Sequence, residues 1–223
     1  MTIPRYLVEN HGSSTEAAKT ILRESIQLAE STGANKITLV VPVKGSFSST
    51  VFGELLGDKA SKSLCKGDAM NLGGGLSLEL TVPKQLSPFI NYGIVIGVYL
   101  SQSDLNQLDS IRSAKAIAYI PWMDDEGKAW QATWSPITWG ESTWNESPPS
   151  FPREVENELH RLTRGINIST GLAHSSDKDN AKLTIKKVKS IAPNISPEDI
   201  RRWAIKNGWQ PRHAEDLSKL VKR

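Results

Sequence analysis

The sequence is poor in cysteine and has no long hydrophobic run. Cys65 is the only cysteine in 223 residues, so no intramolecular disulfide can form, which fits the reducing conditions of the cytoplasm. Met1 to Asn10 contains no extended apolar stretch, so we expect no signal peptide. No segment approaches the about eighteen consecutive apolar residues of a membrane-spanning helix. The composition therefore predicts a cytoplasmic protein that does not cross a membrane.

Motifs for common catalytic and metal sites are also missing. The four histidines are scattered, at positions 11, 160, 174 and 213, and Cys65 stands alone, so no metal-ligand spacing occurs. There is no nucleophile elbow, and there is no Walker pattern, because Lys44 precedes Gly45 instead of closing a glycine-rich loop. We therefore expect no metal and no cofactor, and no residue is identified as catalytic.

Acidic and basic residues are unevenly distributed along the chain. Residues 1–150 carry 12 Lys and Arg against 15 Asp and Glu, whereas residues 151–223 carry 15 against 9. The net charge of +3 thus divides into −3 and +6. A basic region on a near-neutral body is typical of proteins that bind polyanions. A solvated, lysine-rich helix surface would give the same charge, and this interpretation stays open.

The pattern of residues 1–147 is that of an α/β domain. Apolar and β-branched runs, typical of strands buried on both faces, alternate with segments whose apolar residues recur at helical spacing. We expect strands at 6–8, 37–43, 76–82, 94–100 and 116–120. Helices are expected from the Ser13-Ser14 cap to Thr32, and at 49–56, 59–64 and 104–112. This alternation predicts a mostly parallel, layered sheet flanked by helices.

The C-terminal third is expected to be helical and basic. Prolines at 148, 149 and 152 predict a boundary, followed by a helical connector over 153–191 and a two-helix module over 195–223. Ser196 is a good N-cap, Pro197 suits the first helical position, and Asn207-Gly208 ends the first helix. A short basic loop, residues 209–213, then leads to the second helix. The fold class is therefore α/β with a small basic all-helical C-terminal region.

This two-helix module resembles the DNA-binding domain at the C-terminus of the xenogeneic-silencer proteins, nucleoid factors that reach into AT-rich minor grooves. The matching features are a helix ending in IRRWAIKNG, a short basic loop and a second short helix. That family carries Arg-Gly-Arg in the loop, where this chain has Pro211-Arg212-His213. The resemblance implies DNA binding. We expect phosphate contacts from Lys182, Lys186, Lys187 and Lys189, and positions nearest the grooves for Arg201, Arg202, Lys206 and Arg212.

A second candidate site follows the expected strand at 37–43. The residues concerned are Lys44, Ser46, Ser48 and Ser49, at a strand end and a helix start, where α/β sheets bind anions. The stretch TLVVPVKGSFSST looks somewhat like the strand, hydroxyl-rich loop and helix that hold phosphate in the C-terminal domain of pyruvate kinases. His11 could face the same crevice. Hydroxyl side chains at a helix start are also common as simple caps.

Five of the seven tryptophans, at 122, 130, 134, 139 and 144, lie in one segment. Such a density suits packing over the sheet edge or a face that binds a protein partner. Three hypotheses result. The first is a DNA-associated protein whose α/β body binds a partner or a small anionic ligand. The second is a nucleotide- or phosphate-binding enzyme or sensor that uses the strand-end crevice. The third is a non-catalytic subunit of a larger assembly.

Overall fold

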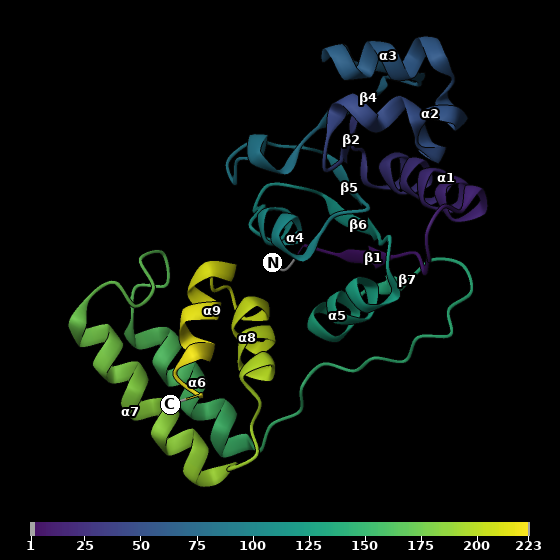
Figure 1. Cartoon of the computed structure of the whole chain (residues 1–223). Helices are drawn as coiled ribbons and strands as arrows, with labels where there is room; N and C mark the ends of the chain where they lie inside the picture. Colours follow the sequence, from purple (N-terminus) through teal and green to yellow (C-terminus); the bar gives the residue numbers. More distant parts are fainter. Residues whose placement is uncertain (1–2, 223) are drawn as a thin grey trace. The chain divides into compact units, whose positions relative to one another are not determined.

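A computed structural model describes residues 3–222 (Figure 1). The chain divides into two compact units. The first contains the residues up to Gln131 together with Ser135–Glu146, and the second contains Ala132–Trp134 and the residues from Ser147 onward. Within the described residues, no helix combines the length and the hydrophobicity needed to cross a membrane.

The first unit is built on a seven-stranded sheet with the order β3-β4-β2-β5-β6-β1-β7. The strands are β1 (Arg5–Leu7), β2 (Lys36–Val40), β3 (Met70–Gly73), β4 (Leu76–Thr81), β5 (Ile94–Val98), β6 (Ala116–Ile120) and β7 (Ile137–Thr138). The neighbouring pairs are parallel except for β3 with β4. The predicted α/β class and mostly parallel sheet are therefore confirmed.

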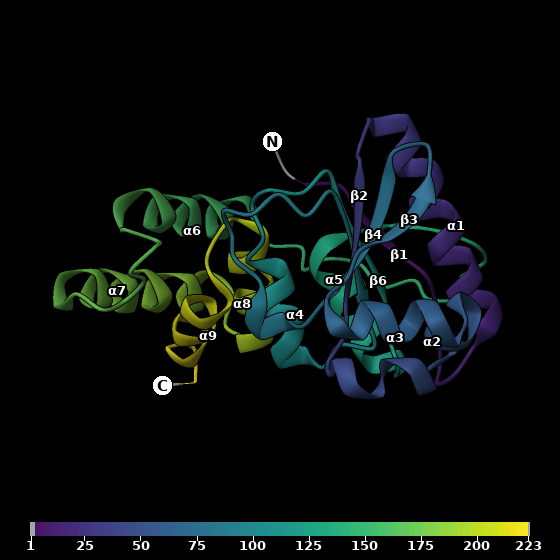
Figure 2. The same cartoon turned by 90° about the horizontal axis from the view of Figure 1, so that it is seen from above.

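Helices cover both faces of this sheet. They are α1 (Thr15–Thr32), the 3₁₀ turn η1 (Lys44–Ser49), α2 (Val51–Leu56), α3 (Asp58–Lys66), the 3₁₀ turn η2 (Pro83–Gln85), α4 (Gln102–Asp109) and α5 (Asp124–Trp134). Figure 2 shows α1 and α4 on opposite sides of the strands. Right-handed crossovers explain this, because the chain moves one way along the sheet from β1 to β2 and the other way from β5 to β6. The loops that follow β1 and β6 therefore leave toward opposite faces.

The predicted strands and helices form where apolar runs and caps are strongest. All residues of β5 and β6 are buried, and the Ser14 side chain accepts a hydrogen bond from the backbone of α1. Three details differ from expectation. The strand expected at 37–43 ends at Val40, Ser101 rather than Ser103 caps α4, and β3, α5 and β7 are additional elements.

The second unit is a bundle of four helices with one hydrophobic core. The helices are α6 (Arg153–Gly165), α7 (Ser175–Ile191), α8 (Pro197–Lys206) and α9 (Pro211–Lys219). The core receives side chains from all four, including Leu159, Ile185, Trp203 and Leu217. The predicted connector and the described part of the predicted two-helix module, residues 195–222, therefore pack together. The expected Ser196 cap is present, since its side chain accepts a hydrogen bond from Asp199 N at 3.0 Å.

Candidate functional site

A row of lysines runs along one face of α7. Lys178, Lys182, Lys186 and Lys189 follow one another at intervals of four, four and three residues, so they share a face of the helix. At 1.5 Å of rise per residue the row is about 16 Å long. Lys182 Nζ lies 2.7 Å from Asp179 Oδ1, and Lys189 Nζ donates to Val221 O at 3.0 Å. Lys178, which is not among the predicted phosphate contacts, adds a lysine to this face one turn before Lys182.

Lys187 does not belong to this row. Its Nζ forms an ion pair with Glu158 of α6, which also pairs with Arg161. Hydrogen bonding to Lys187 lowers the pKa of Glu158, so the pair carries little net charge at neutral pH. The structure thus brings Lys182, Lys186 and Lys189 together and directs Lys187 to a different neighbour.

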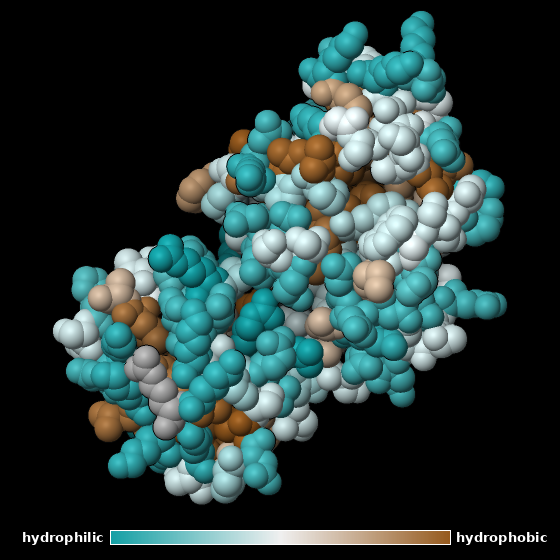
Figure 3. Space-filling model, in the orientation of Figure 1, coloured by the Kyte–Doolittle hydropathy of each residue, from teal (hydrophilic) through white to brown (hydrophobic). Residues whose placement is uncertain are grey.

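The arginines of α8 share one carboxylate. Arg201 Nη1 and Arg202 Nε lie 3.1 and 3.2 Å from Glu198 Oε1. Their side chains are only 13% and 24% exposed. Lys206, at the end of the same helix, is exposed. In Figure 3 the visible face of this unit is largely hydrophilic, with hydrophobic residues showing between the charged ones.

The basic loop expected at 209–213 is shorter in the structure, where only Trp209 and Gln210 of that range lie between α8 and α9. Helix α9 begins at Pro211, so Arg212 and His213 lie in its first turn, and Arg212 is exposed. Trp209 is 1% exposed, and its Nε1 donates to Thr163 Oγ1 of α6 at 2.9 Å. The His213 ring lies close to Gly171, where a Cβ would come within 2.4 Å of it. A proline at the first helical position explains the early start of α9.

The candidate anion residues lie in one 3₁₀ turn, η1. The Ser46 hydroxyl donates to Val43 O at 3.3 Å, and the Ser49 hydroxyl donates to Ser46 O at 3.2 Å. Lys44 is half-buried, and Ser48 lies beside it in the same turn. The hydroxyls of Ser46 and Ser49 thus bond to carbonyls near or within the turn, whereas the N-cap of α2 is Thr50, whose hydroxyl accepts from Gly53 N at 3.3 Å.

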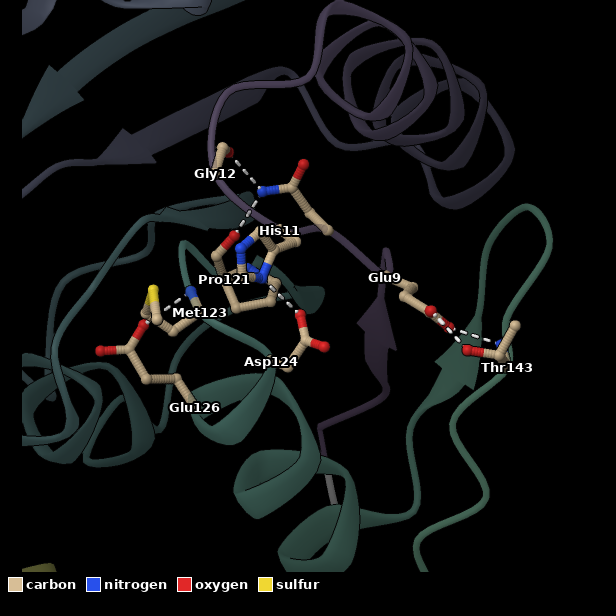
Figure 4. A network of polar contacts seen from close by, with 9 residues as sticks. Glu9, His11, Gly12, Pro121, Met123, Asp124, Glu126 and Thr143 are labelled. Atoms are coloured by element: carbon tan, nitrogen blue, oxygen red, sulfur yellow. Dashed lines mark hydrogen bonds and ion pairs between the residues drawn. The ribbon is translucent and has the colours of Figure 1, made fainter.

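His11 has a partner that local sequence did not indicate. Its Nδ1 lies 2.9 Å from Asp124 Oδ1, which joins the loop after β1 to the first residue of α5 (Figure 4). The two loops are held together by Asn10 Nδ2 donating to Pro121 O at 2.6 Å and by Gly12 N donating to Trp122 O at 2.7 Å. The imidazole is 69% exposed. This arrangement fixes one ring nitrogen and leaves the other toward solvent.

Glu9, also at the end of β1, anchors a distant segment. Its carboxylate accepts hydrogen bonds from Thr143 N at 2.6 Å and Thr143 Oγ1 at 2.7 Å (Figure 4). It also accepts one from Ser142 Oγ at 2.7 Å. Burial on its own would raise the pKa of Glu9, but these hydrogen bonds outweigh it and lower the pKa. Residues 142–144 are therefore fixed beside β1.

The tryptophans between residues 122 and 144 differ in how far they are buried. Trp139 stacks on Tyr6 with ring centroids 4.4 Å apart, Trp130 is buried, and Trp144 is 9% exposed. Trp122 is 44% exposed and packs edge to face on Tyr99, with ring centroids 5.0 Å apart. Tyr99 has a φ of 54°, a sparsely populated conformation for a residue with a side chain.

Comparison with known proteins adds one finding. Residues 154–223 match a family described as "Domain of unknown function (DUF1889)". No curated protein and no solved structure matches the chain. The matched residues span α6 to α9, so the similarity is confined to the helical unit and assigns no activity to it.

Proposed function

We propose that the helical unit binds nucleic acid, with duplex DNA as the expected partner, through the lysine face of α7. The observation that carries this proposal is the row of Lys178, Lys182, Lys186 and Lys189 in a region with a net charge of +6. Each strand of B-DNA presents one phosphate per 3.4 Å of axis, so a duplex offers a dense array of phosphates to a row of about 16 Å. A row of ammonium groups on a rigid helix suits such an array.

The contributions of the basic residues should differ. Lys186 is exposed and forms no ion pair within the described residues, so its charge is fully available. Lys182 shares its charge with Asp179, and Lys187 is compensated by Glu158, so both should contribute less. Arg201 and Arg202 share Glu198, whereas Lys206 and Arg212 are exposed on α8 and α9. Contacts of this kind position a protein on DNA without reading its sequence.

The α/β unit would then bind a protein partner or a small anionic ligand. Trp122, as the most exposed tryptophan of its segment, supports a partner surface there. A cytoplasmic location fits a DNA-associated protein whose only cysteine is unpaired.

A second candidate function is an enzyme or sensor at the strand ends. The His11–Asp124 contact favours it, because a carboxylate that orients one imidazole nitrogen leaves the other for proton transfer. A nucleotide or phosphate ligand would have to use η1 for its anionic group. Thermal-shift measurements with nucleotides and sugar phosphates test this candidate, and Lys44→Ala should remove any stabilisation. A flat response across these ligands would exclude an anion site at η1.

The test of DNA binding is a salt titration with the full chain. With four to six phosphate contacts, log affinity should fall against log salt with a slope on the order of −4 to −5. Lys186→Met should make this slope shallower by about one unit. Lys66→Met is the matched control, because Lys66 is an exposed lysine of α3 that, like Lys186, forms no ion pair within the described residues, and it should leave the slope unchanged. Absence of affinity at low salt would overturn the proposal.

Arg212→Ala tests the resemblance to the silencer proteins. If Arg212 enters the minor groove, its removal should weaken binding to AT-rich duplexes more than to GC-rich ones. Equal loss on both duplexes would contradict minor-groove insertion while leaving the electrostatic proposal in place.

A further inference from the structure

An apolar hollow of about 360 Å³ interrupts the lysine face of the helical unit. It is lined by Lys182, Ile185, Lys186 and Lys189 of α7 and by Leu220, which follows α9. Ile185 and Leu220 are 2% and 9% exposed and belong to the core, so they form the floor. The three lysines, which are exposed or half-buried, form the rim.

The rim presents positive charge in a defined arrangement. The hydrogen bond from Lys189 Nζ to Val221 O fixes that ammonium beside the segment that carries Leu220. Lys182 faces Asp179, one turn nearer the start of α7. Lys186 has no ion pair or hydrogen bond within the described residues, so it can take an anionic ligand without losing a protein partner.

The hollow combines two features that DNA alone would not use. Phosphates need the lysines but gain nothing from an apolar floor, whereas an apolar group gains by displacing water from Ile185 and Leu220. Its volume is at the lower end of the range of about 300–1,000 Å³ for small-molecule pockets, which favours a small ligand over a folded partner.

We propose that this hollow binds a hydrophobic monoanion, an alkyl carboxylate in its simplest form. The alkyl chain would lie on Ile185 and Leu220, and the carboxylate would bond Lys186 with support from Lys182 and Lys189. Because these lysines also belong to the proposed DNA face, an occupied hollow weakens DNA binding. This competition rests on the proposed function, whereas the ligand site itself does not.

The direct test is binding of octanoate to the full chain, measured by calorimetry and by NMR of the methyl groups. Two ligands serve as matched probes: 1-octanol has the chain without the charge, and inorganic phosphate has charge without the chain. Octanoate should bind at least about tenfold more tightly than either, as expected when a charge-assisted bond and apolar contact act together. The methyl signals of Ile185 and Leu220 should shift on binding.

Variants locate the site. Lys186→Met keeps the length of the side chain but removes the charge, and should weaken octanoate binding about tenfold. Lys66→Met removes an exposed lysine of α3 in the same way and should leave octanoate affinity unchanged. Three results would each overturn the site. They are equal affinities for octanoate and 1-octanol, an octanoate affinity that Lys186→Met leaves unchanged, and methyl signals of Ile185 and Leu220 that do not shift on binding.

Competition is measured separately from octanoate binding. Saturating octanoate should lower DNA affinity in the unmodified chain, and Lys186→Met should be less sensitive. Octanoate binding without any effect on DNA affinity would overturn the competition. Octanoate binding by a chain that shows no DNA affinity would overturn the proposed function and support the ligand site.

Discussion

The buried ion pair between Arg5 and Asp109 allows a quantitative test of how the first unit is held together. Arg5 lies on β1 and Asp109 is the last residue of α4, with Arg5 Nη2 and Asp109 Oδ1 3.7 Å apart and both side chains 5% exposed. Trp130 of α5 adds a hydrogen bond from its Nε1 to Asp109 Oδ1 at 3.3 Å. One carboxylate thus connects β1, the strand next to the β7 edge, with two helices.

Replacing Asp109 by Ala should lower the free energy of unfolding by about 3–5 kcal/mol, because it leaves a guanidinium buried without its counter-charge. Coulomb's law gives a similar magnitude, about 4 kcal/mol for charges 3.7 Å apart at an effective dielectric constant of about 20. Amide hydrogen exchange in β5 and β6 measures the opening of this unit separately from the helical one.

The pair Arg5→Met with Asp109→Leu supplies the control. It removes both charges at once, so the double variant should lose clearly less stability than the sum of the single variants Arg5→Met and Asp109→Leu, which complete the cycle. A loss below about 1 kcal/mol for Asp109→Ala, or an additive double variant, would refute the reasoning.

Three further perturbations test other parts of the structure. Gly53→Ala should destabilise the first unit by about 1–3 kcal/mol, because the new Cβ would lie 2.4 Å from a backbone oxygen of η1. A new Cβ at Gly45 would have no atom within 4 Å, so Gly45→Ala should change the free energy of unfolding in urea by under about 0.5 kcal/mol. Equal effects of the two substitutions would contradict the clash expected at Gly53. Trp209→Ala removes a buried side chain and should lower the free energy of opening of α6, measured by amide hydrogen exchange, by about 3–5 kcal/mol. A loss near zero would mean that this side chain is dispensable. Since the folded-state pKa of Glu9 is lowered, its stabilising contribution is present above the ordinary value of 4.5 and is lost as the pH falls through the lowered pKa. NMR titration of the Thr143 amide should show this transition below pH 4.5, and Glu9→Gln should abolish it.

The sequence predicts the centre of the sheet better than its edges. Strands β5 and β6 are buried along their whole length, so their apolar runs are unmistakable. β3 alternates between half-buried and exposed residues and pairs on one side only, so it leaves a weaker pattern. β7 has two residues, and its pairing with β1 cannot be read from local composition.

Helix α5 shows how tertiary packing can override a local signal. Gly127 follows three acidic residues, a combination typical of a solvated turn, yet it lies inside the helix. A Cβ at this position would come within 2.2 Å of the Trp144 ring, so the glycine allows that ring to pack against the helix. The contact joins positions that no local pattern relates.

Some parts of the candidate sites can also be predicted from local sequence, and others depend on the tertiary fold. The sequence predicts one basic set of Lys182, Lys186, Lys187 and Lys189. In the structure three of these share a face of α7, and Lys187 pairs with Glu158 instead. The contact of His11 with Asp124 depends on β1 lying beside β6, and nothing near either residue predicts that order. Trp209 lies in the loop between α8 and α9, as predicted, but its burial depends on α6 and cannot be read from the loop's own sequence.

The position of β1 has a consequence for how the protein is made. The first strand of the chain lies inside the sheet, where Tyr6 is opposite Ala118 on one side and Ile137 on the other. At synthesis rates of about 5–20 residues per second, β1 waits on the order of ten seconds for these partners. During that interval β2, β4 and β5 can already pair, while β6 emerges with an unprotected edge. Completion of the sheet is therefore a late, long-range event, and until β1 docks the edge of β6 is open to pairing with other chains.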